Sequence, residues 1–247
     1  MTSIHFDFSG KTVLVTGASR GIGFGVARGF AQAGADLHIL ATNDTVITAA
    51  KTLGRETGAT VYGHVCDITD RARVGAVMKE FGHIDVLINN AGLERPTPIL
   101  QADEVVDETF HRIIDTNIMG GFHITREALP HMDKGGKIVI TSSIWGQTAV
   151  PEMSAYCASK HANIGFMRAL AQELGPKGIN VNAVCPGWVR TDAAMQSLGH
   201  MARISGRGED ELLAEITAAQ AVPGLMEPDD MIGAYLFLCS DAAKNIT

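Results

Sequence analysis

Short apolar runs recur along the chain, and between them apolar residues return every three or four positions. Apolar residues at consecutive positions, without strict alternation, predict strands that are covered on both faces, as in parallel sheets. The spacing of three or four predicts amphipathic helices. The predicted strands are residues 12–16, 37–40, 86–88, 137–141 and 180–184. The predicted helices are residues 21–33, 44–56, 71–81, 104–132 and 154–174.

Strands and helices alternate from one end of the sequence to the other. This order predicts an α/β fold, a doubly wound parallel sheet of the Rossmann-like type with helices on both faces, in three layers α/β/α. No internal repeat or long linker divides residues 1–247, so we expect a single domain. The least regular stretch, residues 191–228, holds several glycines and prolines around a helical patch at 209–220, and predicts a lid.

A glycine-rich turn follows the first predicted strand and precedes the first predicted helix. Glycines let the backbone approach a pyrophosphate closely, and the N-terminus of the following helix offers N–H groups and the positive end of its dipole. A glycine-rich turn alone also suits any tight turn, but its place between strand and helix predicts a dinucleotide site. The residues of this turn expected to bind the cofactor are Gly17, Ser19, Arg20, Gly21, Ile22 and Gly23.

The end of the second strand carries no acidic residue. In dinucleotide sites an acid at this position binds the ribose hydroxyls and repels a 2′-phosphate. Here the strand ends in neutral residues, of which Thr42 and Asn43 are expected to contact the cofactor, and Arg20 lies in the glycine turn. These charges favour NADP(H). NAD(H) remains the alternative, because neutral strand ends accept either cofactor, Arg20 also suits a solvated surface, and Asp44 lies nearby.

Tyr156 and Lys160 lie four residues apart in a stretch with helical spacing, so their side chains share one helix face. A phenol has an ordinary pKa of about 10, and a neighbouring ammonium lowers it, so the pair can exchange protons with a substrate. The same spacing is common on solvated helices and does not decide the function alone. Upstream, the strand 137–141 ends at Ser142 and Ser143, either of which can hold a substrate oxygen or close the strand end.

Several short motifs together give the chain a resemblance to a known family. They are Gly17-x-x-x-Gly21-Ile-Gly23, Asp67 after the third strand, Asn89-Asn-Ala-Gly92, Asn117, Ser143 with Tyr156-x-x-x-Lys160, and Pro186-Gly187 with Thr191. Each motif alone suits a turn or a helix cap. In this order and spacing, over nearly the whole chain, they resemble the short-chain dehydrogenase/reductase family. The resemblance implies an NAD(P)-dependent oxidoreductase, with one dinucleotide-binding and catalytic domain, that acts on a secondary alcohol or ketone.

The resemblance also implies roles for individual residues. Tyr156 would be the general acid in reduction and the general base in oxidation, and Ser143, rather than Ser142, would orient the carbonyl. Lys160 would tune Tyr156 and bind the nicotinamide ribose, and Asn117 would hold a proton-relay water. The cofactor-binding positions implied in addition are Asp67 and Ile68 at the adenine, Asn89, Ala91 and Gly92 along the cleft, and Pro186, Gly187, Val189 and Thr191 at the nicotinamide end.

Four residues flank the expected reaction centre without belonging to the shared motifs. They are Glu94, Trp145, Glu152 and Trp188. Polar groups in a pocket penalise apolar ligands, so a sugar, a polyol or another small polar hydroxy compound is the expected substrate. The carboxylates also suit a contact with solvent or with another subunit. The alternatives are a 3-oxoacyl thioester reductase, which would need an open basic entrance for a carrier arm, and a sensor that binds NAD(P) without turnover.

Composition limits the partners and the surroundings of the chain. The formal net charge is −7, with no long basic run, so neither nucleic acid nor a membrane surface is an expected partner. No stretch reaches the length of a membrane span, and the first ten residues lack the features of a leader, so we expect a cytoplasmic protein. The four cysteines lie far apart, which predicts neither a disulfide framework nor a metal site.

Assembly is a further expectation from the resemblance. Members of the family are usually dimers or tetramers built through helices that correspond to residues 117–132 and 154–174. Small residues in these stretches, Gly120, Gly121, Ala158 and Ala162, permit close helix packing, so we expect a homo-oligomer, a tetramer or a dimer. Family members also continue beyond residues 241–247 into a last strand, so either the protein has a further tail or it lacks that strand, and the second case would leave a sheet edge unpaired and exposed.

Overall fold

The computed structural model of the chain describes residues 6–101 and 103–247, so part of the N-terminal stretch considered for a leader lies outside the described residues. Six parallel strands form one sheet in the order β3-β2-β1-β4-β5-β6. The strands are β1 (Thr12–Thr16), β2 (Asp36–Ala41), β3 (Val61–Val65), β4 (Val86–Asn89), β5 (Lys137–Thr141) and β6 (Asn180–Val184). The predicted strands are confirmed to within a residue at each end, and the sheet has the predicted doubly wound, Rossmann-like topology.

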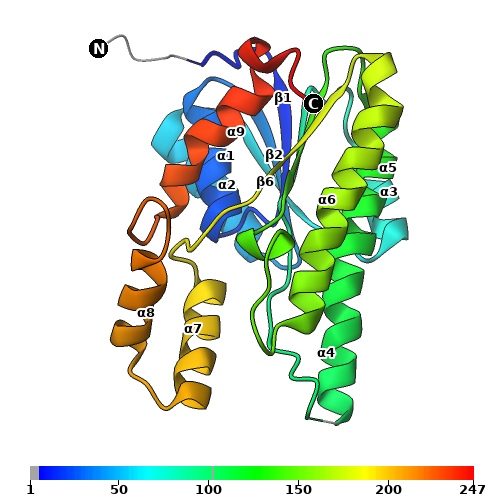
Figure 1. Cartoon of the computed structure of the whole chain (residues 1–247). Coiled ribbons are helices and arrows are strands. Elements are labelled where there is room, and N and C mark those ends of the chain that lie inside the picture. Colours follow the sequence, from blue (N-terminus) through cyan, green and yellow to red (C-terminus); the bar gives the residue numbers. More distant parts are fainter. Residues whose placement is uncertain (1–5, 102) are drawn as a thin grey trace.

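Helices cover both faces of the sheet, as Figure 1 shows. One face carries α1 (Gly21–Gln32), α2 (Thr45–Thr57) and α9 (Ile232–Cys239), and the other carries α3 (Arg71–Met78), α5 (Gly121–Ala128) and α6 (Ser154–Leu174). Side chains alternate between the faces along each strand, so Val13 and Val15 of β1 enter the first core and Leu14 enters the second. Burial on both faces explains why the strands are apolar at consecutive positions.

The long helix predicted over residues 104–132 is one helical run with a changed pitch in the middle. It comprises α4 (Glu104–Ile114), a π-helical turn at Asp115–Gly120, α5 and a short 3-10 turn at Leu129–His131. A π-helical turn interrupts the regular i→i−4 hydrogen bonds, and such turns often occur at functional sites. Asn117 lies inside this turn, not at the start of a helix.

The segment 191–228 is more regular than expected. It forms α7 (Asp192–Ser205) and α8 (Glu209–Ala218), which lie together beyond one edge of the sheet in Figure 1. The patch predicted at 209–220 is confirmed as α8, whereas α7 was missed because Gly199 lies in its middle. A Cβ at Gly199 would lie 3.1 Å from Oε1 of Glu209, so glycine here permits the close approach of the two helices.

The sheet ends at β6 within the described residues, as expected, but its outer edge is partly covered. The backbone N–H of Val181 donates to Oγ1 of Thr247 (2.9 Å), and Nδ2 of Asn182 donates to the carbonyl of Ile246 (2.9 Å). The expectation of an open edge is therefore wrong in part. No helix in the described part of the chain has both the length and the hydropathy needed to cross a membrane.

Two histidines form an isolated polar contact at the other side of the sheet. Nδ1 of His38 on β2 lies 3.0 Å from Nε2 of His64 on β3, and the ring of His38 packs on Tyr62 and Phe81. Burial, followed by the charge of His64, lowers the pKa of His38 from its ordinary value of 6.5 to about 4. The folded chain therefore keeps His38 neutral at a pH where the unfolded chain protonates it.

The sign of this difference makes the fold sensitive to acid. Stability from neutral His38 is complete above about pH 6.5 and is lost as the pH falls towards about 4. Because His38 is only half-buried and solvent screens part of the effect, we expect it to account for about 1 kcal/mol of lost unfolding free energy between pH 7.5 and 5. His38→Gln should shrink the difference between these two pH values by that amount in urea unfolding, whereas His111→Gln, at an exposed position on α4, should not. An unchanged difference in His38→Gln would contradict this account.

Candidate active site

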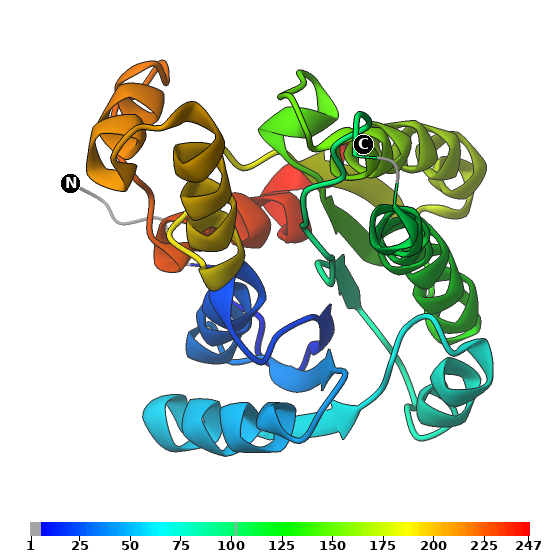
Figure 2. The ribbon, with the colours of Figure 1, turned by 90° about the horizontal axis from the view of Figure 1, so that it is seen from below.

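The carboxyl ends of the parallel strands meet at one edge of the sheet, which is the side seen in Figure 2. A cleft of about 940 Å³ lies at this edge. Ligands of doubly wound folds bind at this kind of edge, where the strand order reverses between β1 and β4. The predicted cofactor-binding residues that line the cleft are Gly17, Ser19, Arg20, Gly21, Ile22, Gly23, Thr42, Asn43, Asp67, Ile68, Ala91, Gly92, Tyr156, Lys160, Pro186, Gly187, Val189 and Thr191.

The glycine turn packs directly on the end of β4. Gly17 has a φ of +65°, and a Cβ there would lie 2.6 Å from Cα of Ala91. A Cβ at Gly23 would lie 2.4 Å from the carbonyl oxygen of Gly17. The first turn of α1 has no side-chain cap and no acidic residue, which leaves its N–H groups for another acceptor. A backbone cradle that any side chain would fill, at an uncapped helix N-terminus, fits the pyrophosphate of a dinucleotide.

Thr16, the residue before the glycine turn, had no role assigned from the sequence, and it joins the two loops that form this cradle. Its Oγ1 donates to the carbonyl of Ile88 (3.3 Å) and accepts from the backbone N–H groups of Asn90 and Ala91 (3.0 Å each). Asn90 was also missed, although it lines the cleft; its Nδ2 donates to the carbonyls of Thr16 and Gly17. These contacts hold the turn after β1 against the end of β4.

Asn89 does not line the cleft, so the prediction for its side chain is wrong. As the last residue of β4 it points towards the helices, is buried, and donates from Nδ2 to Oγ1 of Thr125 (2.7 Å). The alternation of side chains along a strand explains why one of two adjacent asparagines faces a helix and the next reaches the cleft.

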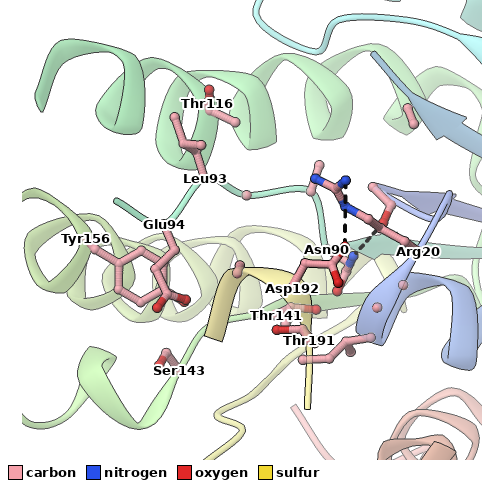
Figure 3. Close-up of a pocket in the computed structure, with 18 of the residues that line it drawn as sticks. Arg20, Asn90, Leu93, Glu94, Thr116, Thr141, Ser143, Tyr156, Thr191 and Asp192 are labelled. Atoms are coloured by element: carbon pink, nitrogen blue, oxygen red, sulfur yellow. Dashed lines mark hydrogen bonds and ion pairs between the residues drawn. The ribbon is translucent and has the colours of Figure 1, made fainter. Parts of the chain in front are cut away.

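Polar groups at the end of β2 are placed near the opening of the cleft. Asn43 accepts on Oδ1 from the backbone N–H and the hydroxyl of Thr45, and so caps the start of α2. Arg20 is exposed and lies 3.9 Å from a carboxylate oxygen of Asp192. Figure 3 shows this pair across the cleft from Tyr156. Exposed pairs at such a distance bind weakly, so Arg20 stays available for an anionic ligand.

Tyr156 and Ser143 face each other at the opposite end of the cleft (Figure 3). Ser143 lies two residues after the end of β5 and caps the 3-10 turn Ile144–Gly146, where its Oγ accepts from the backbone N–H of Trp145 (3.1 Å). Burial raises the pKa of Tyr156 above its ordinary value, and the charge of Glu94 adds to this effect, while the hydrogen bond from Ser143 opposes it. The hydroxyl of Tyr156 is therefore held in its protonated form.

Lys160 lies under the same wall of the cleft and is buried. Its Nζ donates to the carbonyl of Thr141 (2.9 Å) and lies 5.4 Å from the centre of the Tyr156 ring. Burial lowers the pKa of Lys160 to about 8, against the opposing effect of the Glu94 charge. That the ammonium lowers the pKa of Tyr156 stays a prediction: Lys160 lies over the ring face, and burial is the largest influence on the pKa of the hydroxyl.

Asn117 lies beside the cleft rather than in its lining. Its Oδ1 accepts from the backbone N–H of Leu93 (2.6 Å), and its Nδ2 donates to the carbonyl of Leu93 (3.0 Å) and to Oγ of Ser159 (2.9 Å). Both amide hydrogens are thus engaged, and the side chain holds the loop that leads to Glu94. A relay water at Asn117 stays a prediction, and it would have to contact the backbone of the π-helical turn.

Glu94 projects into the cleft beside Tyr156, as Figure 3 shows. Its Oε1 accepts from Oγ of Ser197 on α7 (2.5 Å). Burial raises the pKa of Glu94 above its ordinary value, while the hydrogen bond from Ser197 and the charge of Lys160 oppose this effect. The carboxyl group of Glu94 is therefore a polar group in the part of the cleft lining that faces Tyr156.

The two tryptophans form the apolar part of that wall. The ring of Trp145 packs edge to face on Tyr156 (6.0 Å) and on Trp188 (5.9 Å), and both tryptophans line the cleft. Glu152 does not line the cleft, so the structure does not place it among direct substrate contacts. Its carboxylate instead lies 2.7 Å from Nε2 of His200 on α7.

All four cysteines are unpaired in the structure, and three of them are buried. Among the described residues, no cluster of histidine, cysteine, aspartate or glutamate has the arrangement of a metal site.

Comparison with known proteins agrees with this geometry. The family described as short chain dehydrogenase matches residues 11–201. The chain is 40% identical to oxidoreductase UcpA of Salmonella typhimurium (strain LT2), over 97% of this chain and 91% of that protein. The structure superposes on an L-sorbose reductase from Gluconobacter frateurii, complexed with NADPH and L-sorbose, with a TM-score of 0.86 and 25% identity, over 98% of this chain and 94% of the other.

A second structural neighbour is an actinorhodin polyketide ketoreductase with NADPH, with a TM-score of 0.86 and 32% identity over 96% of this chain and 93% of the other. The match covers the glycine turn, Ser143, Tyr156 and Lys160, which the structure brings together around one cleft. The chain therefore belongs to the short-chain dehydrogenase family and is a nicotinamide-dependent oxidoreductase.

Proposed function

We propose that the protein transfers a hydride between NADP(H) and a small polyhydroxylated ketone or alcohol, of the sugar or polyol class. The observation that carries this proposal is the carboxyl group of Glu94, which projects beside Tyr156 into a cleft that Trp145 and Trp188 also line. A partly buried carboxyl group accepts hydrogen bonds from substrate hydroxyls and disfavours a chain without them. The similarity to an L-sorbose reductase supports the same class.

The chain's own residues orient the substrate and move the proton. Bound NADP(H) supplies or accepts the hydride. In reduction, Tyr156 donates its hydroxyl proton to the carbonyl oxygen as the alcohol forms, while Ser143 donates a hydrogen bond to the same oxygen. Lys160 binds the nicotinamide ribose. Because burial raises the pKa of Tyr156, the residue holds the proton that it donates in reduction.

The second candidate is a 3-oxoacyl thioester reductase, which the similarity to a polyketide ketoreductase supports. A carrier arm would need basic side chains at the entrance of the cleft. Of the three arginines that line the cleft, Arg190 lies 2.7 Å from Glu227 and Arg20 lies 3.9 Å from Asp192, while Arg112 shares the lining with Glu108 and Asp115. This arrangement gives little net positive charge at the rim, so the polyol class is preferred. Ser143, Tyr156 and Lys160 in one cleft argue against a sensor without turnover.

We also propose that α7 and α8 form the substrate lid, that the chain is a single domain and that the protein is cytoplasmic. The two helices extend from the segment that lines the nicotinamide end of the cleft, and Trp188, Leu198 and Leu212 form a small core of their own between them. A separate small core lets a pair of helices move as a unit relative to the sheet.

Turnover on a substrate panel tests the proposed reaction. Purified protein with NADPH is given ketoses, small keto acids and 3-oxoacyl thioesters, and the loss of absorbance of the reduced nicotinamide is followed. We expect reduction of a ketose, and a fall in kcat/KM of about a thousandfold in Tyr156→Phe because the proton donor is lost. Tyr62→Phe, at an exposed tyrosine on β3, is the matched control. Turnover of the thioesters alone would replace the proposed substrate class by the second candidate.

Affinity for the two nicotinamide cofactors tests the preference for NADP(H). Arg20 is the exposed cation beside the neutral end of β2, so Arg20→Ala should raise the Kd of NADPH about tenfold and leave that of NADH nearly unchanged. Arg55→Ala, at an exposed position in the last turn of α2, is the control. Equal affinity of the wild-type protein for both cofactors would remove the preference. The measurement is cofactor fluorescence in a titration.

The assembly is proposed to be a homo-oligomer, a dimer or a tetramer. Four apolar side chains are more than a third exposed along the helical run from α4 to α5, namely Val105, Phe110, Met119 and Phe122. An exposed apolar stripe on neighbouring helices favours association with a second copy. Phe122→Glu should shift the mass measured by light scattering towards the monomer. A monomeric wild-type protein at micromolar concentration would contradict the proposal.

A further inference from the structure

A closed ring of side-chain and backbone contacts surrounds the substrate end of the cleft. Two carboxylates on one side reach the same helix on the other side: Glu94 accepts from Ser197 (2.5 Å), and Glu152 lies 2.7 Å from His200. Ser197 and His200 are three residues apart, so both contacts use one face of α7. Figures 1 and 2 show α7 beyond the sheet edge, and its first residue, Asp192, lies beside Arg20 at the start of α1.

Thr97 closes the ring between the two carboxylates. The backbone N–H of Thr97 donates to the carbonyl of Glu152 (2.6 Å), and Oγ1 of Thr97 accepts from the N–H of Ala155 (3.0 Å). The N-cap residue of α6, Met153, provides no side-chain cap, so Thr97 stabilises the first turn of that helix instead. The segment that carries Glu94 and the start of the helix that carries Tyr156 are therefore fixed to each other.

Glu152 adopts a backbone conformation that needs such support. Its φ is +64°, and it is the one described residue other than glycine with a positive φ. A side chain in this region is strained relative to glycine, so it persists where other contacts hold it. The contact of its carboxylate with His200 is the interaction that a glycine at this position would lose. Through its contact with His200, the strained Glu152 connects α7 to the chain four residues before Tyr156.

The position of α7 determines how much space a substrate has beside Tyr156. Ala193 and Ala194, in its first turn, line the cleft, and Leu198 packs with Trp188 against Trp145. Trp145 in turn contacts the ring of Tyr156. A shift of α7 away from Glu152 would therefore widen the substrate end, while the glycine turn and the cradle for the pyrophosphate would stay in place.

We propose that His200 is a positioning residue, which through Glu152 sets the distance between α7 and Tyr156 and so the fit of a small polar substrate. The proposal rests on the proposed function for the identity of the substrate end. His200 lies outside the cleft lining and does not touch the reacting atoms. His200 bonds neither to the glycine turn nor to Tyr156, so its main effect is on substrate binding.

Three variants test the proposal with two kinds of measurement. His200→Phe removes the hydrogen bond, His200→Gln keeps a donor at the same place, and Glu152→Gly removes the carboxylate but relieves the positive φ. We expect His200→Phe and Glu152→Gly to raise KM for the substrate about tenfold, with kcat within about twofold and the Kd of NADPH unchanged. His200→Gln should restore KM to within about threefold of the wild-type value. Glu152→Gly should keep or raise the Tm, which separates positioning from general destabilisation.

Hydrogen exchange gives a measurement that needs no turnover. In His200→Phe and Glu152→Gly, with NADPH bound, amides of residues 192–205 should exchange about tenfold faster, and those of α1 should not change. Exchange in 192–205 at the wild-type rate in both variants would overturn the proposal, as would an unchanged KM. Absence of turnover by the wild-type protein on the whole panel would instead refute the proposed function, and the exchange rates would still decide the role of His200.

Discussion

The hydroxyl of Thr16 holds together the two strand ends on which the site depends. In a parallel sheet, β1 and β4 are neighbours in space but far apart in sequence, and the chain leaves them in opposite directions. Oγ1 of Thr16 accepts from two successive backbone N–H groups after β4 and donates to the carbonyl before them. This contact brings Ala91 against Gly17 so closely that a side chain at Gly17 would collide with it. The narrow backbone floor of the cleft follows from that approach.

The second constraint is the burial of ionisable groups at the other end of the cleft. Tyr156, Lys160 and Glu94 lie close enough for their charges to act on one another, and burial opposes ionisation of each. Burial dominates for the tyrosine, so the phenol stays protonated, and it lowers the pKa of the lysine without making it neutral below pH 8. The four-residue spacing of Tyr156 and Lys160 predicts that the two side chains share a helix face. It does not predict the directions of their pKa shifts, because the burial of both side chains depends on the lid and on the loop that carries Glu94.

Much of the fold and the shared site could be predicted from the sequence. The strand positions follow from apolar runs, and the cradle follows from glycines after the first strand. What escaped prediction depends on contacts between distant residues. Helix α7 was not predicted because it contains Gly199. A glycine fits at this position because the side chain of Glu209 lies against it. Asn89 and Asn90 are indistinguishable by type and are separated only by strand alternation. The partners of Glu152 and Glu94 lie on a helix whose place no local pattern reveals.

The amide of Asn117 holds the loop before Glu94 entirely through the peptide groups of Leu93. Because Asn117 bonds to backbone groups and not to side chains of the loop, the position of the loop does not depend on which side chains it carries. The family frame can therefore keep its geometry while the residue after Leu93 changes. In evolutionary terms, the selectivity of the pocket can diverge by single substitutions there without a loss of the catalytic frame, and the same freedom is open to engineering.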